Sequence, residues 1–131
     1  MRFETQLDTL VFAILIAGLM PMICAVIAKW GAQGYDNHNP RVWLEHQEGF
    51  RARANAAQQN CLEAFPFFAV GVMLASLGGA DGDLLEMVGW FFVAMRAAYI
   101  ACYVTDKATL RSVVWALGYA AVIYLYVLAL Y

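Results

Sequence analysis

Long apolar runs separated by short polar segments are the dominant pattern along the chain. Three runs contain no charged residue: 10–28, 64–80 and 112–131. A fourth stretch, residues 84–105, has a similar length but contains Glu86 and Arg96. A helix needs about 20 predominantly apolar residues to cross a bilayer. The pattern therefore predicts four transmembrane helices.

Turn-forming residues set the expected helix bounds. Glycine, asparagine, aspartate and proline gather in residues 31–40 and 78–83, and a tight turn is predicted over 106–110. The expected helices cover 6–30, from 41 or 42 past 77, 84–105, and the rest of the chain after 110. We therefore predict an all-α fold class, an integral membrane four-helix bundle, in a single domain spanning residues 1–131.

Composition supports a membrane protein and excludes several other classes. Apolar residues make up 63% of the 131 residues, charged residues only 14%, and the mean hydropathy is +0.62. A soluble domain is about half apolar and about a quarter charged. A disordered chain, a coiled coil and a soluble globular domain are therefore excluded. The net charge of −2 argues against nucleic acid as a partner.

The cations predict an orientation in the membrane. With four spans, both termini and residues 78–83 share one side, and that side contains only Arg2. The other side contains the remaining cations near the span ends: Lys29, Arg41, Arg51, Arg53, Lys107 and Arg111. Loops rich in lysine and arginine stay in the cytoplasm. We therefore expect the polar, cation-rich end to face the cytoplasm and both termini to face the periplasm.

Cysteine and histidine offer no clear chemistry at this stage. Cys24, Cys61 and Cys102 lie in or beside apolar segments, where small buried side chains are the simplest interpretation. His38 and His46 do not have metal-ligand spacing with other donors. We predict no metal site.

The second predicted span begins with polar side chains that share one face. Ionisable groups at membrane depth are costly, so each needs a partner or a task. At about 100° per residue, Asn60 lies about 20° and Glu63 about 80° from Arg53. These residues, although on an apolar span, form a polar face.

Two further groups lie on the third and fourth spans. Arg96, Tyr99 and Tyr103 fall within about 60° of arc, and Arg111 opens the fourth span near Lys107. Guanidinium groups suit carboxylates, and a glutamate suits an ammonium group. A zwitterionic ligand with carboxylates and an amine fits this set. The spacing leaves open a purely structural alternative, in which Glu63 pairs with Arg96 inside the bundle.

The polar motifs resemble those of the MAPEG family (membrane-associated proteins in eicosanoid and glutathione metabolism). The run RARANAAQQNCLEAFPFF, residues 51–68, is similar to the family signature in the second span. The segment YDNHNPR, residues 35–41, resembles the first loop of bacterial members. The run RAAYIACYVTDKATLRS, residues 96–112, is similar to a second signature. The resemblance covers essentially the whole chain.

The resemblance implies a homotrimer in the bacterial inner membrane. It implies a glutathione site between adjacent subunits, open to the cytosol, and either transferase or peroxidase activity toward a lipophilic electrophile or hydroperoxide. Membrane lipids and the lipophilic substrate are then the other partners, and glutathione is the co-substrate.

Residue roles follow from the same resemblance. Asn60 and Glu63 would hold the backbone and amine of glutathione, Tyr99 and Tyr103 would line the cleft, and Arg53 and Arg96 would neutralise carboxylates or brace the polar network. Arg111 would lie beside the thiol as the catalytic residue, Gln58 would contact the tripeptide, and Lys29 stands where some members carry arginine. Two departures are notable. Ala56 replaces an arginine that many members carry, and the spacing from Tyr103 to Arg111 is one residue longer than in some eukaryotic members.

Three alternatives remain open on the sequence. A non-catalytic member of the same fold would bind a lipid or a partner without turnover. A small four-span exporter would need an ionisable glutamate in its first span, and residues 10–28 contain none. A purely structural bundle would leave the polar face of the second span unexplained.

Overall fold

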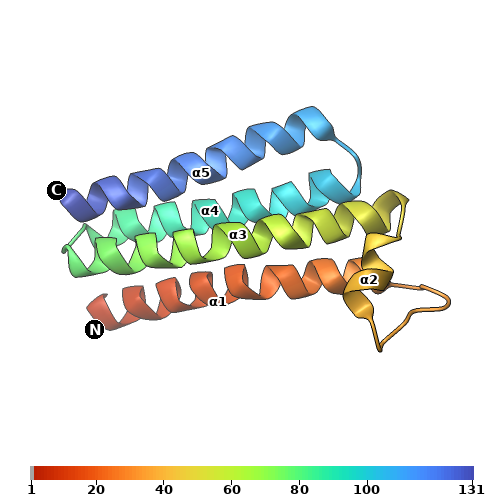
Figure 1. The fold of residues 1–131 in the computed structure, drawn as a ribbon. Coiled ribbons are helices and arrows are strands. Elements are labelled where there is room, and N and C mark those ends of the chain that lie inside the picture. The colour runs from red at the N-terminus through yellow and green to blue at the C-terminus, as the bar shows by residue number, and fades with distance from the viewer. Residues whose placement is uncertain (1) are drawn as a thin grey trace.

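The computed structural model describes the backbone of residues 2–131 and the side chains from residue 7 onward. Its helices are α1 (Arg2–Lys29), α2 (Pro40–Glu45), α3 (Gly49–Leu77), α4 (Gly82–Val104) and α5 (Ala108–Leu130). The four long helices lie side by side, and both chain ends lie at the same end of the bundle (Figure 1). All four are long and apolar enough to cross a membrane. The predicted all-helical four-span fold is confirmed.

The prediction of one continuous second helix starting at residue 41 or 42 is wrong. A short helix, α2, ends at Glu45, and α3 begins separately at Gly49. Gly49 has a φ of +61°, a left-handed conformation that glycine adopts without steric cost. Pro40 supplies a favourable first residue for α2. The chain therefore turns between the two helices, and α2 lies across the end of the bundle (Figure 1).

The other long helices begin earlier than expected. α1 starts at Arg2, because residues 2–8 contain no glycine or proline to delay it. α4 starts at Gly82, where the Asp81 side chain accepts a hydrogen bond of 3.0 Å from the Leu84 amide. α5 starts at Ala108, because Asp106 reverses the chain with a φ of +60°. The turn before α5 is therefore shorter than the predicted 106–110 segment.

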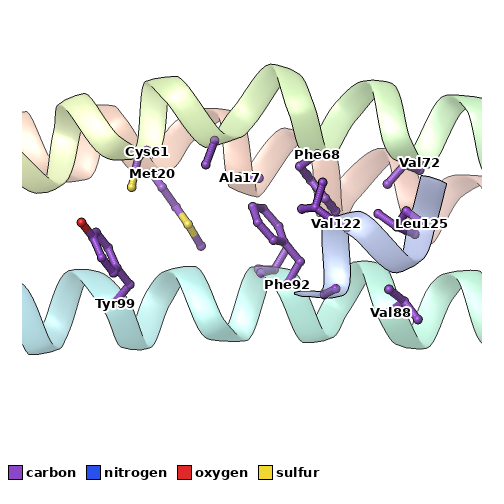
Figure 2. Close-up of a cluster of buried hydrophobic side chains, with 14 of the residues drawn as sticks. Ala17, Met20, Cys61, Phe68, Val72, Val88, Phe92, Tyr99, Val122 and Leu125 are labelled. Carbon is purple, nitrogen blue, oxygen red and sulfur yellow. The ribbon is translucent and has the colours of Figure 1, made fainter. Parts of the chain in front are cut away.

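Aromatic, aliphatic and small side chains together form the core between the helices (Figure 2). Phe68 of α3 stacks on Phe92 of α4 with ring centroids 4.1 Å apart. Ala13 and Ala17 of α1 are buried in the same cluster. The outer faces carry large apolar side chains, as expected for helices in contact with lipid. The buried alanines let the helices approach closely, as is usual for helix packing within a bilayer.

Two helix glycines make a matched test of this packing. A Cβ on Gly71 would lie 3.0 Å from the Tyr126 ring and 3.3 Å from the Leu125 Cβ, whereas a Cβ on Gly118 would lie no closer than 3.6 Å to a neighbour. We expect Gly71→Ala to lower the free energy of unfolding by about 1–2 kcal/mol. We expect Gly118→Ala to raise it by up to about 1 kcal/mol, because alanine favours the helix. Unfolding in mixed micelles measures both, and equal effects would contradict the packing described.

Candidate functional site

A buried arginine links α4 to α3 in the half of the bundle where α2 lies. Arg96 is only 3% exposed. Its Nη2 donates to the Asn60 Oδ1 at 2.9 Å and to the Cys61 Sγ at 3.3 Å. Its Nη1 is buried and has no hydrogen-bond partner among the residues described. The guanidinium is therefore held in place, yet one donor remains unused.

Two tyrosines lie between this arginine and a second arginine at the start of α5. The Arg96 Cζ lies 4.3 Å from the Tyr99 ring centroid. The Tyr99 and Tyr103 rings meet edge to face at 5.5 Å, and the Arg111 Cζ lies 4.3 Å from the Tyr103 ring. Spacings of three and four residues place the first three side chains on one face of α4. We call these four residues the arginine–tyrosine row.

The tight turn before α5 completes the row. Asp106 takes a left-handed conformation, and the Lys107 amide donates a hydrogen bond of 2.8 Å to the Cys102 carbonyl. This reversal returns the chain beside α4, so that Arg111, in the first turn of α5, reaches Tyr103. The structure therefore brings together Arg96, Tyr99, Tyr103 and Arg111, as the sequence predicted, and adds Asn60 from α3.

Two other arginines hold helix ends together. Arg53 donates from Nε and Nη2 to the Val104 carbonyl, at 3.2 and 3.1 Å. Arg51 donates from Nη1 to the Ala28 carbonyl at 2.9 Å. The last carbonyls of a helix lack partners within the helix and carry partial negative charge. Within the protomer, Arg53 therefore links the first turns of α3 to the end of α4.

Glu63 does not pair with Arg96. Its side chain is exposed on the outer face of α3, while Asn60 is half-buried and holds the guanidinium. Glu63 also stands at the midpoint of Gly49–Leu77, beside Leu62, which is 56% exposed. The alternative of an internal Glu63–Arg96 pair is therefore wrong. A carboxylate stands on the apolar outside of the protomer.

A second group of polar side chains lies on another side of the protomer. A cavity of about 420 Å³ is lined by Ala25 and Lys29 of α1, Pro40, Arg41, Leu44 and Glu45 of α2, and Asn55, Gln58, Gln59 and Leu62 of α3. We call it the α1–α3 pocket. Gln58 and Asn60 are about 200° apart around α3, so they face opposite sides. The predicted residues Lys29 and Gln58 therefore lie apart from the arginine–tyrosine row.

The sequence did not single out Arg41, Glu45, Asn55 or Gln59 as site residues. Their placement at the pocket depends on α2, which folds back over the ends of α1 and α3. A continuous second helix would have placed Arg41 and Glu45 away from this pocket. The available signal was Gly49, which follows a polar segment and ends the regular helical pattern. Lys29 also stays at the pocket through its contact with the Tyr35 ring, 4.8 Å from Nζ to the centroid.

The fold and the polar residues define a class of four-span membrane proteins with arginine and tyrosine at one end of the bundle. The model of the MAPEG family matches residues 9–131, nearly the whole chain. The protein therefore belongs to the MAPEG family, which includes glutathione transferases and peroxidases, and it is an integral membrane protein. No curated protein matches the chain.

Proposed function

We propose that the protein is a glutathione-dependent enzyme of the bacterial inner membrane, with the polar end of the bundle facing the cytoplasm. It activates the glutathione thiol for attack on a lipophilic electrophile or hydroperoxide. The arginine–tyrosine row carries the proposal, because it begins at the buried Arg96 and ends at Arg111, which is only half-buried. Such a row offers cationic and phenolic donors in a setting of low dielectric, where they act strongly on a developing anion.

Arg111 is the proposed catalytic residue. A free thiol is mostly protonated at neutral pH, and a guanidinium beside the sulfur stabilises the thiolate. The Tyr103 ring holds the Arg111 guanidinium at the start of α5. With an electrophile, the thiolate forms a carbon–sulfur bond and the leaving group departs. With a hydroperoxide, it attacks the terminal oxygen and releases an alcohol, and a second glutathione converts the sulfenic acid to glutathione disulfide and water.

The site is proposed to form between copies of the chain in a homotrimer. A carboxylate facing lipid near the middle of a span is costly, and among the side chains that the structure describes none pairs with Glu63, so it needs a polar neighbour from elsewhere. A second copy packed against α3 would provide it. Within a single protomer, the α1–α3 pocket and the arginine–tyrosine row lie apart. The same contact would bring the pocket of one protomer toward the row of the next.

Glutathione has a charge pattern that fits the two groups together. The tripeptide carries two carboxylates and one ammonium group, and the α1–α3 pocket presents Lys29, Arg41 and the Glu45 carboxylate. In the proposed complex, Asn60 and Glu63 hold the peptide backbone and amine, Tyr99 lines the cleft, and Gln58 and Lys29 reach the ligand from the pocket side. Arg96 and Arg53 keep this framework in place.

Calorimetric titration of the purified protein with glutathione tests the binding site. We expect saturable heat for the parent protein and a loss of affinity of about tenfold or more for Glu63→Gln, which removes the charge that holds the amine. Glu86→Gln is the matched control, because Glu86 is a carboxylate near the start of α4, at the opposite end of that helix from the arginine–tyrosine row. Equal affinity in Glu63→Gln and Glu86→Gln would contradict the assignment. Binding without any turnover would select the non-catalytic alternative.

A further inference from the structure

Arg41, on the short helix α2, is a guanidinium that the protomer leaves without a partner. It lines the α1–α3 pocket, and its side chain is exposed. Among the side chains that the structure describes, none forms a hydrogen bond, an ion pair or a ring contact with Arg41. Arg51 and Arg53, in contrast, donate to the carbonyls of Ala28 and Val104. The Arg41 guanidinium is therefore available to a ligand in the pocket.

Packing holds α2 across the end of the bundle, although the helix is short (Figure 1). Leu44 is only 7% exposed and packs with Ala28 of α1 and Ala54 of α3. On the same helix, the Trp43 ring meets the Tyr35 ring edge to face, with centroids 5.0 Å apart. A side chain presented from a backbone that is already held in place loses less freedom on binding than one on a free loop. The second residue of α2 is therefore well placed to bind.

The charges that line the α1–α3 pocket fit a single carboxylate. The lining includes two cations, Lys29 and Arg41, and one carboxylate, Glu45, so one positive charge is unbalanced. Amide side chains of α3 add neutral hydrogen-bond donors beside these charges. A guanidinium binds a carboxylate through two parallel hydrogen bonds, whereas the ammonium group of lysine acts as a point charge. Arg41 is therefore the lining residue best suited to recognise a carboxylate.

We propose that Arg41 binds the glycine carboxylate of glutathione and selects for thiols that carry a carboxylate at this end. The inference rests on the glutathione site proposed above, in which Asn60 and Glu63 hold the peptide backbone and the amine. The carboxylate next to that amine stays on the side of Glu63, so the glycine end is the part of the tripeptide left to the α1–α3 pocket. A thiol without a carboxylate at this end loses the paired hydrogen bonds to the guanidinium. Arg41 therefore determines specificity for the thiol substrate.

Calorimetric titration of the full-length protein with two ligands tests this role. The ligands are glutathione and its glycinamide analogue, in which an amide replaces the glycine carboxylate. We expect the parent protein to bind glutathione about tenfold more tightly than the analogue, because only glutathione forms the charged contact. Arg41→Gln is expected to bind both ligands with the affinity that the parent has for the analogue. Lys107→Gln, which removes an exposed cation that does not line the pocket, is the matched control and is expected to keep the tenfold preference.

The outcomes separate this inference from the proposed function. If the parent binds glutathione and Arg41→Gln keeps the parent's preference, Arg41 does not recognise the glycine carboxylate, while the proposed glutathione site stands. Equal affinity of the parent for the two ligands would contradict the inference without any variant, and so decides it even if Arg41→Gln fails to fold. If the parent does not bind glutathione, the proposed function fails and the role of Arg41 fails with it.

Discussion

Replacement of Arg111 by alanine is expected to lower kcat/KM for conjugation of glutathione to an aromatic electrophile by about 10²–10³-fold. The guanidinium lies over the Tyr103 ring in the first turn of α5, at one end of the arginine–tyrosine row. Its removal deprives the thiolate of its proposed counter-charge, and most of the loss is expected in kcat. Steady-state kinetics at saturating glutathione measure the effect.

Two further variants complete this prediction. Arg111→Lys keeps the charge but loses the planar fork, so an intermediate loss is expected. Lys107→Ala removes an exposed cation four residues away and is expected to leave the rate unchanged within about twofold. If Arg111→Ala turns over glutathione like the parent, or if Lys107→Ala loses as much activity, Arg111 has no part in thiol activation.

Replacement of Arg96 by methionine is expected to reduce turnover by about 10²-fold while changing the free energy of unfolding by less than about 1 kcal/mol. In the proposed mechanism, Arg96 is a positioning residue. It holds the Asn60 side chain and lies against the Tyr99 ring, and its loss frees both. A buried guanidinium with one unused donor contributes little stability, because its desolvation offsets its contacts.

Paired measurements on the same preparation check this prediction. Thermal unfolding reports stability, and the KM for glutathione together with kcat reports positioning. A structural role alone would give the opposite result, with clear destabilisation and normal turnover of the folded fraction. Asn60→Ala, which removes the partner of Arg96, is expected to reproduce the loss of turnover.

The angular spacing of residues around a helix predicted that Arg96, Tyr99 and Tyr103 share a face, because all three belong to one uninterrupted helix. The same spacing was less informative for α3. Asn60 and Glu63 are about 60° apart, yet one faces the bundle and the other faces outward. The spacing of residues along a helix does not show which neighbouring helix each face packs against, because that depends on the tertiary structure.

The α1–α3 pocket and the helix-end contacts illustrate the same limit. The break at Gly49 was missed because an isolated glycine in a helical pattern is often tolerated. The pocket depends on that break, since it brings α2 over α1 and α3. The contacts of Arg51 and Arg53 with backbone carbonyls 23 and 51 residues away depend on how the helices dock, and no local pattern signals them.

Subunit complementation tests the central claim, that one protomer's pocket and the next protomer's row form a single glutathione site. Arg111→Ala chains are co-expressed with chains carrying Lys29→Ala and Gln58→Ala, each inactive alone. In the proposed trimer, random mixing of the two chains leaves roughly a quarter of the sites with both halves intact. We predict that the mixture regains activity close to that fraction of the parent value. A mixture as inactive as its components, although the two chains co-purify, would contradict the shared site.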